Sequence, residues 1–591
     1  MKVKAIIKNL LIWRIRHIDD KKFILFLSVI VGFLAGISAV IIKNAVHFIQ
    51  SLLQGGIIEK YHNYLYFILP AFGILIAVLF IRYILRRSVG HGIPTLLFSI
   101  SKANGKIPRH NMFSSIITSA FTVGFGGSVG LEGPTVATGA AYGSNLGHYF
   151  HLNYRQVSLI LACAGAGAMS AIFKAPIAAI VFVIEVLMLD LTLTSLLPLL
   201  FASVTAAITS YLFLGMDVLY PVKEIEEFLI NEIPFYILLG VITGLVSVYF
   251  ARCYKYIQKK FELINNGLKK WLIGGSILGL LIFLFPSLYG EGYDAINSAL
   301  HGNHSYLFDN SIFSGLQENI ILITSFFLLV IIFKVVATAV TFEAGGVGGI
   351  FAPTLFIGAN TGLLFAYISN YLGIKSLALN NYTLVGMAGL IAGVLHAPLT
   401  AIFLIAETTG GYALFIPLMI VSTISYATIK IFETHSVYTY QLANKGELFT
   451  HDKDKVILSI LTVNKLIETN FLTINKNASL GDLVKVISKS CRNIVPVVDN
   501  DNNLFGIVFI NDVRHIIFKP ELYEKIMVSE LMYMPSPAVH PKESMEDVAK
   551  KFQTTEHYNL PVIENGKYKG FVSRANVFSA YRKLLKEFSD D

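Results

Sequence analysis

Long apolar runs with almost no charge recur along the first three quarters of the chain. They lie at residues 23–42, 66–81, 191–216, 235–250, 272–285, 320–333 and 414–429. A helix needs roughly 20 apolar residues to cross a bilayer, and several of these runs are shorter. The pattern therefore predicts a bundle of membrane-spanning helices between residues 23 and 440, some of them tilted or broken.

The pattern changes near residue 440. Beyond it, charged residues become frequent, and short runs typical of β-strands alternate with amphipathic helical stretches. Residues 493–517 match residues 558–581 as two copies of strand, turn, strand and helix. We therefore predict a linker at 441–462, followed by two similar α/β domains at 463–520 and 521–591.

The apolar part of the chain also contains a repeat. The segment GLEGP at 130–134 recurs as GIFAP at 349–353, and glycines follow both segments at the same spacing. Downstream, APIAAIVFVIE at 175–185 recurs as APLTAIFLIAE at 397–407. Two membrane halves with interrupted helices at matching positions indicate a transport site at their interface. The sequence leaves open whether the two halves have opposite orientations.

Composition and charge support a membrane protein with cytosolic ends. The chain is 54% hydrophobic and 14% charged, and its formal charge of +9 comes from Lys and Arg next to or beyond the apolar runs. This distribution indicates cytosolic termini and no nucleic-acid partner. Residues 1–22 are expected to hold a cytosolic helix, with a basic amphipathic stretch at 5–18 on the inner membrane surface. Cys163, Cys253 and Cys491 are too scattered for a disulfide framework.

Three glycine-rich segments ending in proline interrupt the apolar sequence, at 90–94 (GHGIP), 130–134 and 349–353. Glycine permits unusual backbone conformations, and proline is favoured in the first turn of a helix. Each segment therefore predicts a helix that begins inside the membrane. A helix N-terminus binds an anion without a full cation, and weakly enough to release it. The alternative is that these glycines only allow helices to pack closely.

Glu132 lies inside one of these segments, far from the apparent membrane edges. An ionised group at mid-membrane costs about 3 kcal/mol or more, so such residues usually have a function. Its carboxylate would compete with chloride for the same N–H groups and would leave when protonated or displaced. The alternatives are a glutamate at the membrane interface and one held by a structural hydrogen bond.

These segments, the repeated AP-x-x-A-I helices and a late tyrosine, Tyr438, resemble the CLC family of chloride channels and proton–chloride exchangers. The resemblance covers residues 20–440. It implies an all-α polytopic membrane protein with internally repeated halves and broken helices, which forms a homodimer with one anion pathway per subunit. Glu132 takes the position of the family's gating glutamate. The other implied anion-binding positions are His91, Gly92, Ile93, Leu131, Gly133, Gly349, Ile350, Phe351 and Tyr438.

The resemblance also implies a role for several of these positions. Leu131 and Gly133 would lend backbone near an outer anion site, and Ile350 and Phe351 would offer N–H groups to a central chloride. The Tyr438 hydroxyl would face that ion from the inside. Taken alone, Tyr438 would more often be an aromatic anchor at the membrane interface.

Three positions depart from the family's pattern. His91 stands where the family often has an ion-coordinating serine, which leaves anion preference and pH dependence open. Leu131 replaces a common Arg or Lys. Val186 stands where many exchangers carry a second glutamate that relays protons, and valine cannot carry a proton. This pattern predicts a passive chloride channel of the voltage-gated type, with a proton-coupled chloride antiporter as the alternative. Glu185 and Glu407 hold equivalent repeat positions, so a shared structural role is expected for them.

The two C-terminal domains resemble a tandem pair of CBS domains, which adds an α/β module to the helical membrane part. Adenine nucleotides would be bound through a Ser/Thr-x-x-Asp pattern after the second strand. The first copy has Asp512 without the hydroxyl, and the second has Ser573 and Asn576 without the carboxylate. The sequence therefore favours a dimerisation and coupling module over a nucleotide site.

Other functional classes fit less well. A CBS-containing magnesium transporter would need clustered carboxylates, which the apolar sequence does not offer, so no metal site is expected. An enzyme is not expected either, because no nucleophile–base constellation occurs among the spans. A fluoride-selective relative stays open because of His91. We expect chloride as the transported ion, no required cofactor, and an integral protein of the plasma membrane, which is the inner membrane in a bacterium.

Overall fold

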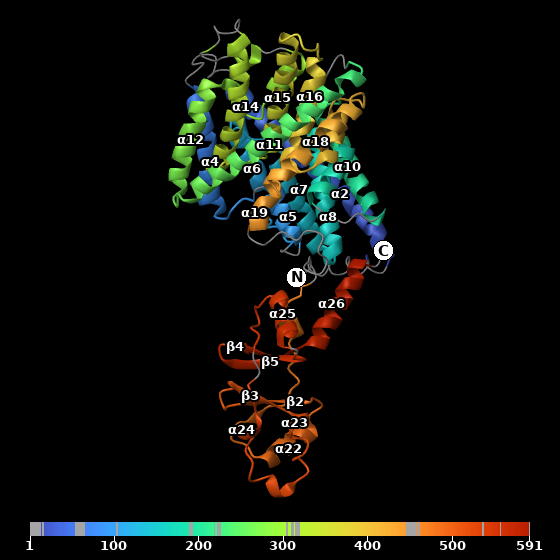
Figure 1. Ribbon diagram of the computed structural model, residues 1–591, viewed down its shortest axis with the longest axis vertical. Helices are drawn as coiled ribbons and strands as arrows, with labels where there is room; N and C mark the ends of the chain where they lie inside the picture. Colours follow the sequence, from blue (N-terminus) through green and yellow to red (C-terminus); the bar gives the residue numbers. More distant parts are fainter. Residues whose placement is uncertain are drawn as a thin grey trace, which may run out of the picture. The chain divides into compact units, whose positions relative to one another are not determined.

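The computed structural model describes the chain except for residues 1–13, 15–16, 54–64, 91, 102–104, 188–192, 218, 222–225, 303–304, 309–312, 314–319, 445–457, 459–460, 535–536, 556 and 590–591. Contacts divide the chain into two compact units, Met1–Leu448 and Phe449–Asp591. The first unit is helical, and the second combines helices with short strands (Figure 1). The amphipathic helix expected at 5–18 lies almost wholly outside the described residues.

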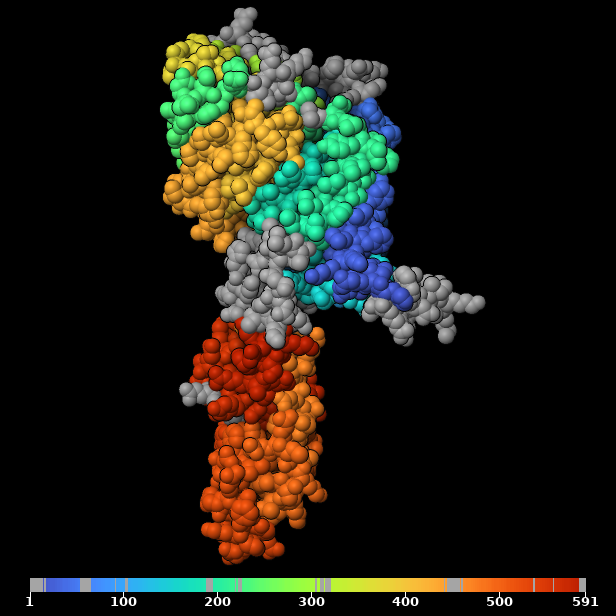
Figure 2. All heavy atoms as spheres, turned by 90° about the vertical axis from the view of Figure 1, so that its right-hand side faces the viewer, coloured from blue at the N-terminus to red at the C-terminus, as the bar shows by residue number. Residues whose placement is uncertain are grey.

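Within the described ranges, nine helical stretches are long and apolar enough to cross a membrane. They are α2 (Asp20–Leu53), α4 (Leu65–Leu79) continued by the π-helix η2 (Phe80–Leu85), α8 (Tyr154–Phe173), α10 (Leu193–Leu214), α11 (Ile233–Glu262), α12 (Gly267–Leu284), α14 (Ile320–Glu343), α15 (Phe351–Tyr371) and α18 (Phe415–Phe432). Large apolar side chains face outward from them, such as Ile321 at 71% and Leu212 at 77% exposure. The expected membrane bundle is confirmed, and Figure 2 shows early, middle and late segments sharing one face of it.

Shorter helices complete the first unit. They are α5 (Ile93–Ser101), α6 (Asn111–Gly124), α7 (Glu132–Tyr149), α9 (Pro176–Leu187), α13 (Tyr293–Leu300), α16 (Leu379–Leu395), α17 (Pro398–Thr408) and α19 (Val437–Asn444), with 3₁₀ turns η3 (Ile230–Glu232), η4 (Pro286–Leu288) and η5 (Ser305–Leu307). Helices α5, α7 and α15 each begin within one of the three glycine-rich segments, with proline in the first turn. The prediction that these segments open new helices is confirmed.

The internal repeat is visible in the backbone as well as in the order of the elements. Helices α6 to α10 correspond to α14 to α18. Gly126 and Gly345 precede the two repeated segments with φ values of +98° and +101°. Lys174 and His396 end α8 and α16 in the left-handed conformation, with φ values of 56° and 57°. Because matching positions adopt the same unusual conformation, the two halves share one backbone plan.

Glycines downstream of the repeated segments serve helix packing. An added Cβ would lie 3.0 Å from the Ala164 carbonyl oxygen at Gly139, and 2.6 Å from the Gly386 carbonyl oxygen at Gly358. Helices α7 and α8 therefore pack backbone against backbone, as do α15 and α16. The close-packing explanation holds for these glycines, whereas Gly130 and Gly349 have a different environment.

The second unit contains two small sheets. One has the order β1 (Ile474–Asn475), β2 (Ile494–Val498) and β3 (Leu504–Phe509), and the other pairs β4 (Asn559–Glu564) with β5 (Lys567–Ser573). The helices are α21 (Val463–Leu466), α22 (Leu480–Lys489), α23 (Ile510–Val513), α24 (Val528–Leu531), α25 (Met545–Thr555) and α26 (Arg574–Ser589), with the 3₁₀ turn η7 (Pro520–Leu522). Both hairpins are antiparallel and both lead into a helix. The duplicated strand, turn, strand and helix pattern is therefore present in both copies.

Candidate anion-binding site

Two of the glycine-rich segments meet directly. The N–H of Gly130 donates to the carbonyl oxygen of Gly349 at 2.8 Å, and the N–H of Gly349 donates back at 2.7 Å, in an isolated antiparallel bridge. Helices α7 and α15 begin immediately after this bridge. Two helix N-termini, each with unpaired N–H groups and a partial positive charge, therefore lie next to each other.

Glu132 occupies the place where these N-termini meet. Its side chain is fully buried, and its Oε2 has no hydrogen-bond partner among the described residues. A Cβ at Gly349 would lie 2.9 Å from this oxygen, and one at Gly130 would overlap the carboxylate. The backbone N–H groups of Glu132 itself and of Ala352 approach the carboxylate. The glycines thus make room for a carboxylate held by both repeats.

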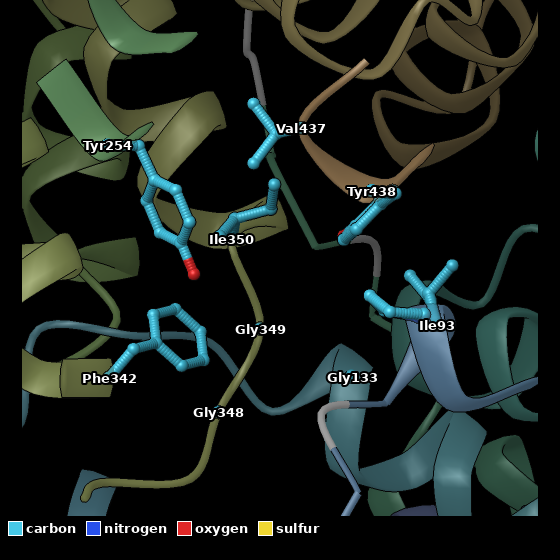
Figure 3. Close-up of a pocket in the computed structure, with 10 residues that line it drawn as sticks. Ile93, Gly133, Tyr254, Phe342, Gly348, Gly349, Ile350, Val437 and Tyr438 are labelled. Atoms are coloured by element: carbon cyan, nitrogen blue, oxygen red, sulfur yellow. The ribbon is translucent and has the colours of Figure 1, made fainter. Parts of the chain in front are cut away.

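A small cavity lies beside the bridge (Figure 3). Its volume is about 30 Å³, which is enough for a monatomic ion. The lining residues are Ile93, Pro94, Gly133, Tyr254, Phe342, Gly348, Gly349, Ile350, Val437 and Tyr438. Segments from both repeats, the start of α5 and the start of α19 therefore converge on one ion-sized space.

Two tyrosines turn their hydroxyl groups toward this cavity (Figure 3). Tyr438 is buried, and its hydroxyl lacks a hydrogen-bond partner within the part of the chain that the structure describes. A buried hydroxyl without a partner is costly, so this O–H group is available to an ion. Tyr254 of α11 is the second tyrosine, and our reading of the sequence missed it because it lies in an ordinary apolar helix far from any glycine-rich segment.

The third glycine-rich segment also reaches the site. Gly92 has a φ of +66°, and a Cβ there would lie 2.7 Å from the backbone of Gly133. Only glycine allows this approach, which brings Ile93 to the cavity. Leu131 and Phe351 are both buried next to the bridge but do not line the cavity. His91 lies outside the described residues.

Comparison with known proteins identifies the family. A family model described as voltage gated chloride channel matches residues 72–430, which is more than half of the chain. The chain belongs to the CLC family. Models of the CBS domain match residues 463–519 and 528–583. The chain is therefore an integral membrane protein of a family that transports anions, with a C-terminal CBS pair, as its motifs predict.

Relatives with different names match over similar lengths. The chain is 30% identical over 387 residues to a protein of Ralstonia nicotianae named as a ClcB-like chloride channel protein, covering 64% of this chain and 86% of that one. It is 29% identical over 411 residues to the H⁺/Cl⁻ exchange transporter ClcA of Salmonella typhimurium, covering 67% of this chain and 83% of that one. One relative is thus named as a channel and the other as an exchanger.

Solved CLC structures share the fold. A slow cyanobacterial Cl⁻/H⁺ antiporter superposes with a TM-score of 0.61 at 23% identity, covering 71% of this chain and 97% of that one. A eukaryotic CLC transporter superposes with a TM-score of 0.59 at 17% identity, covering 94% of this chain and 97% of that one. The expected fold class is confirmed.

Glu185 and Glu407 bind reciprocally across the two CLC repeats. The Glu185 carboxylate accepts hydrogen bonds from the N–H groups of Leu399 and Thr400 at the start of α17, at 2.9 and 2.7 Å. Glu407 accepts from Ile177 and Ala178 at the start of α9, at 3.1 and 2.8 Å. Each glutamate therefore caps a helix of the other half, which is the kind of shared structural role expected from the repeat. The next residue, Val186, is buried in the apolar core.

Four charged or polar groups near Glu132 were not among the residues singled out from the sequence. Tyr293 donates to Glu132 Oε1 at 3.0 Å, and Glu291 accepts from the Leu131 N–H at 3.1 Å. The other two are lysines in apolar helices, Lys334 buried and Lys43 partly exposed. Lys43 donates to the Ile172 carbonyl, and Lys334 donates to the carbonyls of Leu288 and Gly290. The signal was available, since Lys43 and Lys334 interrupt apolar runs where charges are rare.

Two of the three candidate nucleotide positions of the CBS pair, Ser573 and Asn576, bond within the protein. Ser573 donates its hydroxyl hydrogen to Glu468, whose other carboxylate oxygen pairs with Arg492 at 2.8 Å. The Asn576 side chain donates to the Leu466 carbonyl at 3.4 Å. Asp512, in the other copy, is exposed to solvent.

Proposed function

We propose that this CLC protein conducts chloride passively along a path gated by Glu132. The observation that carries the proposal is the buried carboxylate seated between two helix N-termini, directly beside an ion-sized cavity. A carboxylate and a chloride ion compete for the same N–H donors, because both are anions that a helix N-terminus stabilises. Removal or protonation of the carboxylate opens these donors to chloride.

The donors around the cavity suit a transported halide. They are backbone N–H groups at helix starts and the Tyr438 hydroxyl, and none of them carries a full charge. Such donors replace part of the hydration shell of an ion without holding it too tightly to leave. Lys43 and Lys334 are already paired with backbone carbonyls, and neither lines the cavity.

Passive conduction is favoured by the end of α9. Val186 has no group that can carry a proton, and the adjacent Glu185 is held by the start of α17. A proton arriving from that side would find neither residue ready to pass it on. The pathway therefore supports chloride movement without an obligatory proton.

Proton-coupled chloride exchange is the second candidate. It is favoured by the relative and the solved structure that are named as H⁺/Cl⁻ exchangers. Because Val186 cannot carry a proton, exchange would need another residue as the proton carrier. Tyr254 is positioned to contribute because its hydroxyl faces the cavity. In this alternative, Glu132 would carry the proton as well as gate the ion.

Reconstituted vesicles separate the two candidates. The purified protein is placed in vesicles with an outward chloride gradient while external pH and chloride are recorded together. A potassium ionophore is added to balance the charge. If chloride release is then complete without proton movement, the result supports the channel. Uphill proton movement at a fixed ratio to chloride overturns the channel in favour of the exchanger. No chloride movement in active, folded protein overturns both.

The choice of anion is tested in the same vesicles. One structural neighbour is described as a fluoride/proton antiporter, and His91 takes a position expected to face the ion. We expect chloride to move faster than fluoride. A faster fluoride flux would reassign the substrate while keeping the pathway.

The pathway is also expected to have a defined oligomeric state and a defined orientation in the membrane. We propose a homodimer in the plasma membrane with both termini in the cytosol, and a CBS pair at 463–520 and 521–591 that couples to the membrane part. Chemical crosslinking in vesicles tests the dimer, and protease access to the CBS pair in sealed vesicles of known orientation tests its side.

A further inference from the structure

A second carboxylate reaches the start of α7. Glu291 lies in the loop between η4 and α13, and its Oε1 accepts the N–H of Leu131 at 3.1 Å. Leu131 is the residue immediately before α7, so this N–H belongs to the set that a helix N-terminus offers to anions. Unlike Glu132, Glu291 is partly exposed to solvent. One N–H group at the start of α7 is therefore held by a carboxylate that is partly accessible to solvent.

The loop that carries Glu291 is firmly fixed. Lys334 donates to the carbonyls of Leu288 and Gly290 at 3.1 and 3.0 Å, and the Ser128 hydroxyl donates to Leu288 at 2.8 Å. The Gly290 N–H donates to the carbonyl of Gly126 at 3.2 Å. The contact between Glu291 and Leu131 is thus built into the packing of this loop against the segment before α7.

The charges around the two carboxylates balance. The groups that face Glu291 electrostatically come from several elements and are Glu132, Lys43, Lys334, Tyr220 and Tyr293. With both lysines charged and both carboxylates ionised, the formal sum of the cluster is zero. Adding a proton to one carboxylate leaves a single positive charge, and one chloride ion restores neutrality. In a low-dielectric interior such an imbalance is costly, so proton uptake favours anion uptake.

We propose that Glu291 is a second gating carboxylate, which withholds the Leu131 N–H from anions until it takes up a proton. The inference rests on the proposed function of Glu132. One proton passes from the solution to a carboxylate oxygen of Glu291, no other covalent bond changes, and the proton returns to the solution when the anion leaves. The neutral acid accepts the Leu131 N–H less strongly than the carboxylate does, so the anion can take that donor.

The pH dependence of chloride flux in the absence of Glu132 titration tests this role. Vesicles containing Glu132→Gln are compared with vesicles containing Glu132→Gln together with Glu291→Gln. Glutamine keeps the shape and an acceptor oxygen, so the loop stays in place, but it cannot titrate. We expect flux through the single variant to rise several-fold as the pH falls from about 9 to about 4, a range that covers the ordinary pKa of a glutamate and the value of about 8 to which burial raises the pKa of Glu291, and the double variant to have no such rise.

The neighbouring Asp294 supplies the matched control. It is exposed and lies three residues along the same segment, so Glu132→Gln with Asp294→Asn should keep the rise in full. A single variant without any residual pH dependence overturns the inference, and so does a double variant that keeps it. Absence of chloride flux in every folded variant would instead count against the proposed function.

Chloride binding gives a readout that does not depend on flux. In calorimetry at about pH 9, where the parent's Glu291 is ionised although burial raises its pKa to about 8, Glu291→Ala should bind chloride roughly tenfold more tightly than the parent, because a charged competitor for the N–H group has been removed. Unchanged or weaker binding by a variant with an unaltered elution profile overturns the inference. Glu291→Gln serves as the second variant if the alanine protein does not fold.

Discussion

At the scale of single residues, the site depends on polar atoms that the protein itself leaves without partners. Glu132 Oε2 and the Tyr438 hydroxyl are both buried and unpaired within the described residues. Proteins rarely leave such groups unsatisfied. An ion that accepts from the hydroxyl, or that replaces the carboxylate, removes this cost.

The first residue-scale prediction concerns Glu132. Glu132→Gln should give a higher chloride flux near neutral pH than the parent does, because glutamine is a permanent stand-in for the protonated acid. Flux assays from about pH 4 to about pH 7 measure this. The exposed Glu227→Gln is the control and should follow the parent. A Glu132→Gln protein with the parent's full pH dependence would refute the gating role.

The second prediction concerns Tyr438. Tyr438→Phe should weaken chloride binding by roughly fivefold, since it removes one hydrogen bond of about 1 kcal/mol. Its thermal stability should not fall, because the hydroxyl bonds no described residue. Calorimetry and thermal unfolding measure the two effects, with the exposed Tyr371→Phe as control. Equal chloride affinity in parent and variant would remove Tyr438 from the site.

At the scale of elements, the site is formed by the N-termini of helices α5, α7 and α15, which begin in glycine-rich segments that interrupt the apolar sequence. The bridge between Gly130 and Gly349 ties two such starts together, and Gly92 brings the third within contact of Gly133. The glycines here provide space for a carboxylate and for backbone contacts, whereas those downstream provide close helix packing.

Gly349→Ala tests the element-scale argument. The added methyl would meet the Gly133 nitrogen at 2.8 Å and Glu132 Oε2 at 2.9 Å, so it should push apart the two helix starts whose N–H groups bind the ion. We expect chloride binding to fall at least tenfold while the protein stays folded and keeps its elution volume. Gly411→Ala, which has no neighbour within 4 Å, should behave as the parent. Normal chloride binding by Gly349→Ala would show that the space between Gly349, Gly133 and Glu132 can accommodate a methyl group.

Much of the element plan could be predicted from the sequence, because glycine, proline and a repeat offset carry local information. The starts of α5, α7 and α15 follow from such local signals, and so does a shared structural role for Glu185 and Glu407, although the helices that these glutamates cap do not. Tyr254, Tyr293 and Glu291 could not be placed, because each reaches the site through tertiary packing of a segment with no motif of its own. The two lysines were visible as charges in apolar runs, but their partners are backbone carbonyls, which no sequence pattern marks.

At the scale of the whole molecule, the second unit has the CBS fold, but the two candidate nucleotide positions of its second copy, Ser573 and Asn576, bond within the protein. The Glu468 carboxylate takes both the Ser573 hydroxyl and Arg492. A nucleotide would have to break these bonds or bind elsewhere.

We therefore predict that adenine nucleotides leave the full-length protein unaffected. A ligand at about 100 times its dissociation constant would add about 2.7 kcal/mol to the free energy of unfolding, which thermal unfolding in detergent detects easily. ATP, ADP and AMP should each give no shift. A clear rise in the midpoint with any of them would contradict the prediction, and loss of that rise in Asp512→Ala would locate the site in the first CBS copy.

The reciprocal bonds between the repeats have a consequence for how such a protein could arise. Gly130 pairs with Gly349, Glu185 holds the start of α17, and Glu407 holds the start of α9. A polypeptide consisting of one half would have a helix N-terminus without its capping carboxylate and only one strand of the glycine bridge. Only a second molecule could supply the missing groups. An ancestor of that size would have worked as a pair, and joining two gene copies end to end would have made that partnership permanent.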